Sequence, residues 1–167
     1  MSVSFYSASV PVFKQFLTSL KALLAKAEQF SQQKELEDSV LLQTRLYPDM
    51  FPLVRQVQIA ADFAKSVSAR LAEVEVPAYE DNEQTFAQLQ QRLDKTLAFL
   101  DSLTAEQFAQ AADKEIVLRP GTAKEKRFSG SAYLLNYGLP QFYFHLTTSY
   151  ALLRHNGVEI GKKDYMG

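Results

Sequence analysis

The stretch LPQFYFHLTTSYALLRHNG, residues 139–157, decides the fold that this sequence predicts. Apolar side chains occur on almost every side of a helix drawn through it, so this helix should lie at the centre of a core or be shared with a second subunit. It carries His145 among aromatic residues and ends at Asn156 and Gly157, a pair typical of a helix C-terminus. The chemical question is whether His145 belongs to a metal site or to a packed core.

Three further helices are predicted before this stretch, from apolar residues that recur at spacings of three and four. They cover residues 10–27, a segment that starts near Asp49 and runs to residue 71, and residues 86–100. Ser9 is placed to cap the first helix, and the carboxylate of Asp49 is placed to cap the second. Each helix has one apolar stripe, so the four helices should pack around a shared core.

One segment with strand character separates the third helix from the last. Residues 115–128, EIVLRPGTAKEKRF, predict a small β-hairpin or an irregular insertion. Beyond it, Gly138 and Pro140 interrupt the last helical region, and because proline lacks a backbone donor we expect a kink or a restart at Pro140. The predicted fold class is all-α, a four-helix bundle with this insertion before the last helix, and residues 1–167 form a single domain.

Composition excludes several classes of function. The net charge of −1 leaves no basic excess to bind phosphate backbones, so we expect no nucleic acid partner. The absence of cysteine excludes a thiol nucleophile and any cysteine-bound metal. No apolar run approaches the roughly 18 residues of a membrane span, and the N-terminus lacks the pattern of a signal peptide. We therefore expect a cytoplasmic protein that has no membrane partner.

The common catalytic motifs are missing. Neither histidine has a carboxylate three residues before it, as the di-iron sites of helix bundles require, because Phe142 and Leu152 occupy those positions. There is no G-x-S-x-G nucleophile turn and no glycine-rich phosphate loop. A catalytic residue cannot be assigned from a motif.

A helical wheel of the second helix separates one glutamine from its polar neighbours. Gln56 falls inside the apolar arc, whereas Arg55, Gln58 and Asp62 lie on the opposite side. Arg55, Asp62 and Lys65 should form a solvated face, with Asp62 paired to Lys65. Gln56 is therefore expected to point into the bundle.

On the last helix, Gln141, His145 and Ser149 form one row at spacings of four. If this row also faces inward, Gln56, Gln141 and His145 would meet and hydrogen-bond one another. We weighed a satisfied polar cluster in the core against a ligand or metal site. Tyr137 belongs to an aromatic run that would either pack the core or wall a pocket near the interruption of the helix.

Two blocks of the sequence resemble the signatures of a known family. They are YPDMFPLVRQVQIAADFAK, residues 47–65, and LPQFYFHLTTSYALLRHNGVEIGKKDYMG, residues 139–167. Both look like an uncharacterised bacterial family, the domain of unknown function numbered nineteen ninety-three, within the DinB/YfiT-like superfamily. The resemblance implies a DinB-like four-helix bundle with up-down-down-up connectivity that is often dimeric.

The superfamily typically holds a divalent metal on three histidines, one on the second helix and two in an H-x-x-x-H pair on the last. Carried over by this resemblance, His145 matches the second histidine of the pair, Gln141 replaces the first, and Gln56 replaces the ligand of the second helix. The resemblance thus implies a degenerate metal site. We expect no metal or other cofactor, and Zn, Ni or Fe on His145 is the alternative.

Two functions follow from these expectations. The first is a bundle without catalytic activity that binds a small molecule or only associates with its own copy as a homodimer. The alternative is a divergent DinB-like transferase or isomerase, metal-dependent or thiol-dependent, in which His145 is a general base or the single metal ligand. The expected ligand pocket consists of His145, Gln141, Gln56, Ser149 and Tyr137.

Overall fold

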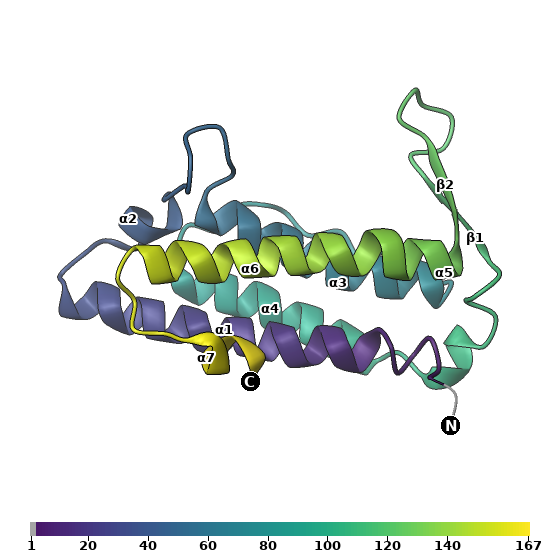
Figure 1. The fold of residues 1–167 in the computed structure, drawn as a ribbon, viewed down its shortest axis with the longest axis horizontal. Coiled ribbons are helices and arrows are strands. Elements are labelled where there is room, and N and C mark those ends of the chain that lie inside the picture. Colours follow the sequence, from purple (N-terminus) through teal and green to yellow (C-terminus); the bar gives the residue numbers. More distant parts are fainter. Residues whose placement is uncertain (1–2) are drawn as a thin grey trace.

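The computed structural model describes residues 3–167 and consists mainly of four long helices that run side by side (Figure 1). The predicted all-α four-helix bundle is therefore confirmed. Its four main helices are α1 (Val10–Gln33), α3 (Leu53–Leu71), α4 (Phe86–Asp101) and α6 (Leu139–His155). The shorter elements are α2 (Asp38–Leu42), the 3₁₀ turn η1 (Ala105–Phe108), β1 (Glu115–Leu118), β2 (Lys126–Ser129), α5 (Gly130–Ala132), the π-helical η2 (Tyr133–Gly138) and α7 (Lys162–Met166).

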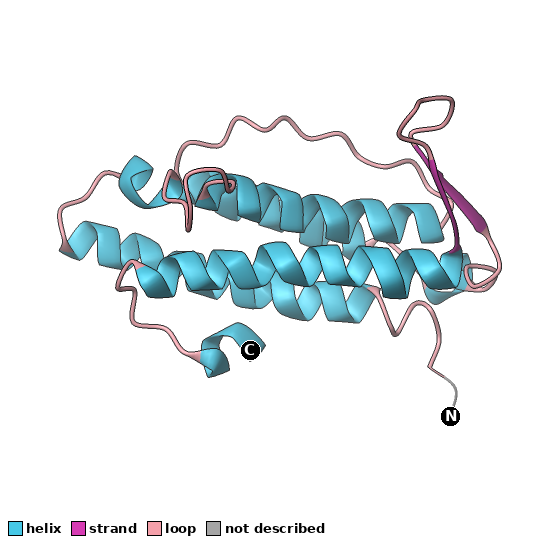
Figure 2. Ribbon diagram, turned by 45° about the horizontal axis from the view of Figure 1, so that its top comes forward, coloured by secondary structure: helices cyan, strands magenta, loops and turns pink. Residues whose placement is uncertain are grey.

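The connection between α3 and α4, residues 72–85, decides the topology. It runs back along the length of the bundle before α4 begins, as Figure 2 shows. Consequently α3 and α4 point in the same direction, and the connectivity is up-down-down-up. Within residues 3–167, none of the helices combines the length and the apolar character needed to cross a membrane.

The apolar last helix lies largely inside the bundle. Phe142 of α6 is fully buried and meets Phe13 of α1 edge to face, with ring centroids 4.9 Å apart. Such aromatic pairs add about 0.5–1.5 kcal/mol to the effect of burial alone. The same helical region nevertheless leaves Leu135 and Phe144 more than half exposed. The apolar side chains of this region thus pack into the core on one side of the helix and are exposed on the other.

The insertion before α6 is an antiparallel hairpin, as predicted, in which Ile116 of β1 pairs with Phe128 of β2. The helix that follows does not restart at Pro140. It continues from Gly130 into α6 through the π-helical segment η2, where the amide of Leu139 donates to the carbonyl of Leu134 five residues earlier. In this wider turn the amide bonds to the carbonyl five residues earlier, so the helix continues through Pro140 although proline has no N–H to donate.

Two predicted helix caps are wrong. The Ser9 hydroxyl donates to the carbonyl of Phe5 at 2.6 Å and does not accept from an amide of α1. Asp49 lies in a turn before α3, and the residue that precedes this helix is Pro52. Proline fixes the extended entry into the helix without a side-chain cap.

A buried arginine attaches the 72–85 connection to the bundle. Arg92 of α4 is only 3% exposed, and its guanidinium contacts Asp62 of α3 and both Asp81 and Glu83 of the connection, each at 2.9 Å. A buried guanidinium needs such partners because desolvation of an unpaired charge is costly. The Arg92 network therefore joins two parallel helices and the connection that makes them parallel.

This network corrects the solvated face predicted for α3. Lys65 is buried, pairs with Asp62 at 3.0 Å and places its ammonium 3.9 Å from the centre of the Tyr79 ring. Gln58, also expected at the surface, is buried and donates to Glu83 at 2.7 Å. The helical wheel identified the face that avoids the core, but the 72–85 connection covers it.

The Arg92 network yields a stability prediction. Arg92→Met should leave partly buried carboxylates uncompensated and lower the free energy of unfolding by about 2–3 kcal/mol, below the value for a fully buried pair because Asp62 and Asp81 are partly exposed. Urea denaturation would measure it. Arg127→Met, which removes ion pairs to Glu115 and Glu125 that are screened by solvent, is the matched control and should change the stability much less. Equal losses in the two variants would contradict the structural role given to Arg92.

Candidate functional site

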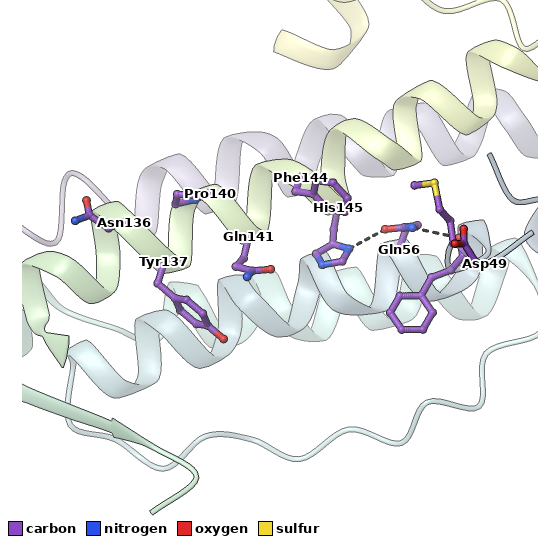
Figure 3. Close-up of a pocket in the computed structure, with 10 residues that line it drawn as sticks. Asp49, Gln56, Asn136, Tyr137, Pro140, Gln141, Phe144 and His145 are labelled. Atoms are coloured by element: carbon purple, nitrogen blue, oxygen red, sulfur yellow. Dashed lines mark hydrogen bonds between the residues drawn. The ribbon is translucent and has the colours of Figure 1, made fainter. Parts of the chain in front are cut away.

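A cavity of about 520 Å³ opens beside His145. It lies along α6 and η2, and the loop before α3 closes one end (Figure 3). Its volume falls in the range of pockets that bind small molecules. The residues that line it are Asp49, Met50, Phe51, Gln56, Asn136, Tyr137, Pro140, Gln141, Phe144 and His145.

A hydrogen bond between α6 and α3 fixes the orientation of the histidine. The Nδ1 atom of His145 lies 2.7 Å from Oε1 of Gln56, and Nε2 of the same glutamine donates to the carbonyl of Phe51 at 3.1 Å. Because that carbonyl can only accept, the amide group must present its oxygen to the imidazole. His145 therefore carries its proton on Nδ1, and in the neutral ring Nε2 has a free lone pair.

The surroundings keep His145 neutral. Its ring stacks on Phe63 with centroids 6.0 Å apart and meets Phe144 edge-on at 5.1 Å. Burial in this environment, followed by the positive charge of Arg55, lowers the pKa of His145 from 6.5 to about 4. At neutral pH the site thus contains an uncharged imidazole that is a hydrogen-bond acceptor through Nε2.

The structure brings together four of the five side chains expected at the pocket. His145, Gln56, Gln141 and Tyr137 all line the cavity. Within residues 3–167, no hydrogen bond joins Gln141 to the other two, so the predicted three-membered cluster forms only between His145 and Gln56. Ser149 does not line the cavity, because it is buried further along α6 and its hydroxyl donates to the carbonyl of His145 at 2.9 Å.

Sequence reasoning missed the wall that the loop before α3 supplies. Asp49, Met50 and Phe51 come shortly before Gln56 in the sequence, and this closeness is the signal that could have identified them as part of the site. It also missed Asn136, a polar residue that no motif or periodicity singled out. Phe144 belongs to the aromatic run that was expected to pack the core or wall a pocket, and both residues lie on a row of α6 and η2 next to that of His145.

The residues present do not fit the divalent metal that the superfamily implies. Both polar groups of Gln56 are engaged, one by His145 and one by the Phe51 carbonyl. Gln141 can offer only a neutral amide, which binds transition metals poorly. Over residues 3–167 there is no group of three or more His, Cys, Asp or Glu side chains that could hold a metal ion.

Comparison with known proteins agrees with the fold. Residues 5–166 match the family model of a domain of unknown function, DUF1993. A crystal structure of a DinB family member protein from Shewanella denitrificans at 1.83 Å resolution is similar, with 42% sequence identity and a TM-score of 0.91. The match covers 97% of this chain and 91% of that one. No curated protein matches the sequence.

The lowered pKa of His145 predicts a pH dependence of stability. Protons bind the unfolded histidine near pH 6.5 but the folded one only near pH 4, so the stability present above pH 6.5 is lost as the pH falls toward 4. The protein should be about 2 kcal/mol less stable at about pH 5 than at about pH 7.5 as a result of this group. Urea denaturation at both pH values would measure the difference.

His145→Gln is the control, because glutamine does not titrate. The loss of stability between the two pH values should be smaller in this variant by the contribution of His145. An identical pH dependence in the wild type and the variant would show that the folded imidazole titrates normally.

Proposed function

The chain belongs to the DUF1993 family and has a DinB-like fold, and from this premise we propose that it binds a small molecule, without a metal, in the cavity beside His145. The cavity carries the proposal. It combines aromatic walls with a few polar groups that converge on one place, which is the usual composition of a small-molecule site. The unsatisfied Nε2 of His145 supplies a directional contact for such a ligand.

The alternative, a transferase or isomerase that uses His145, has less support. A general base is most effective when its pKa lies near the working pH, and the pKa of His145 is lowered to about 4. Among residues 3–167, the other ionisable groups that line the cavity are the carboxylate of Asp49 and the phenol of Tyr137. A single imidazole is also too few ligands for a catalytic metal.

Fragment binding in the presence of a chelator tests the proposal. Saturation-transfer NMR with phenol, indole and benzamide in EDTA should detect at least one fragment in the roughly millimolar range expected for ligands of this size. Gln141→Trp, which places a large ring in the cavity, should abolish the signal. The proposal fails if no fragment binds, if the chelator removes binding, or if Gln141→Trp binds as well as the wild type.

Self-association is a second part of the proposal, supported by the apolar surface around the cavity. Phe144 is 56% exposed and Phe51 52%, and both line the cavity together with the exposed Pro140. Exposed apolar groups that lie close together are a common feature of interfaces between subunits. We propose a homodimer through this surface, and the cytoplasmic location expected from the sequence stays a prediction.

Sedimentation velocity at micromolar concentration should give the mass of a dimer. Phe144→Asp should shift the protein to monomer, because a carboxylate would be desolvated at the interface. Val40→Asp changes an equally exposed apolar residue of α2 outside the cavity lining and should leave the dimer intact. A wild-type monomer at this concentration would refute the dimer.

A further inference from the structure

We propose that the cavity selects an uncharged, planar ligand that presents an amide-type N–H donor beside a carbonyl acceptor, as a lactam or a primary carboxamide does. The inference rests on the proposed function and specifies its ligand class. It follows from the hydrogen-bonding capacity that the cavity leaves free, from the charges around it and from its aromatic walls.

The Nε2 atom of His145 can bind a hydrogen-bond donor of the ligand. Its Nδ1–H is committed to Gln56, whose own amide is held by the Phe51 carbonyl, so the ring cannot reverse its polarity without breaking two hydrogen bonds. Among the described residues, nothing bonds to Nε2. A ligand that donates N–H or O–H to Nε2 gains a bond in a largely buried position, whereas one that presents only acceptors leaves the lone pair unsatisfied.

The carboxamide of Gln141 can bind both a hydrogen-bond donor and an acceptor of the ligand. It lies one helical turn before His145 on the same row, and Figure 3 shows the two side chains next to each other along the cavity. Its carboxamide has no hydrogen-bond partner among residues 3–167, so it offers N–H and C=O together. A lactam can accept from the Gln141 N–H through its carbonyl while its single N–H donates to His145, and a primary carboxamide has a second N–H for the carbonyl of Gln141.

The charges near the site favour ions of neither sign, because Arg55 and Asp49 are opposite in charge and each offsets the attraction that the other would exert on an ion. An anion would face the lone pair of His145 and the carboxylate of Asp49. A cation would be repelled by Arg55, whose guanidinium is close enough to act on His145. A neutral ligand avoids both penalties, which grow where water is excluded.

The walls favour a flat body. Phe51, Tyr137 and Phe144 supply rings from the loop, from η2 and from α6, and the side chain of Pro140 lies between the last two in sequence. Aromatic surfaces bind planar groups by stacking or edge contacts over a large area. The ligand should therefore place its ring against these walls and its amide between Gln141 and His145.

An isosteric pair of probes tests the donor requirement. Isoindolin-1-one is a cis lactam, and phthalide replaces its N–H by oxygen with nearly the same shape. In NMR titrations at neutral pH the lactam should bind about tenfold more tightly than the lactone, as expected for one unmade hydrogen bond. Benzoate should bind more weakly than benzamide. Equal affinity of lactam and lactone, or tighter binding of benzoate than of benzamide, would overturn the inference.

Two variants connect the preference to the named side chains. His145→Phe, which keeps a ring but cannot accept a hydrogen bond, should lower the affinity for the lactam to that for the lactone. Gln141→Leu, at a half-buried position, removes the donor to the carbonyl of either probe and should lower both affinities. Gln110→Leu, at an exposed position outside the cavity, is the control and should keep the full preference. A preference that survives His145→Phe, or affinities that Gln141→Leu leaves unchanged, would refute the assignment.

The outcomes separate this inference from the proposed function. If none of the fragments or probes binds, the proposed function fails. If they bind in the cavity without distinguishing lactam from lactone, small-molecule binding stands and only the ligand class is wrong.

Discussion

The close contact between α3 and α6 is the constraint on which the rest of the structure depends. A Cβ atom added at Gly138 would lie 2.8 Å from Cγ2 of Val67, so only glycine permits this approach without displacing the valine. Further along the same contact, His145 and Gln56 form their hydrogen bond. The contact thus fixes the distance between the two helices and, with it, the position and tautomer of the one histidine inside the bundle.

The Arg92 network supports this arrangement from the opposite side of α3. It attaches the long 72–85 connection to α3 and α4, and so maintains the parallel pair that up-down-down-up connectivity requires. Arg55 connects the network with the cavity, because it pairs with Asp81 of the connection and its charge lowers the pKa of His145. A loss of the connection would therefore change the electrostatic environment of the cavity as well as the stability of the bundle.

The bundle could be predicted because each of the first three long helices has one regular apolar stripe and the last is apolar on almost every side. The hairpin could be predicted because turn residues separate its two strands. The inward position of Gln56 followed from the same periodicity. The burial of Lys65 and Gln58 could not be predicted, since a helical wheel does not show that an irregular connection covers their face. Of the two alternatives predicted at Pro140, a kink or a restart, the restart is wrong, because a π-helical turn lets the helix continue past a residue that has no amide donor. The loop residues of the cavity escaped prediction because their role depends on where the chain turns before α3.

Gln56 and Gln141 stand where the resemblance to the superfamily implies histidines, and this exchange would change what the site can recognise. The superfamily's typical metal is a Lewis acid and attracts ligands that donate electron pairs. In this chain Gln56 accepts the Nδ1 proton of His145 and donates to the Phe51 carbonyl, so the amide satisfies both neighbours without a metal. The electron pair on Nε2, which a metal would otherwise use, is then available to a hydrogen-bond donor. A neutral N–H or O–H donor is therefore the chemical complement that we propose for this free electron pair.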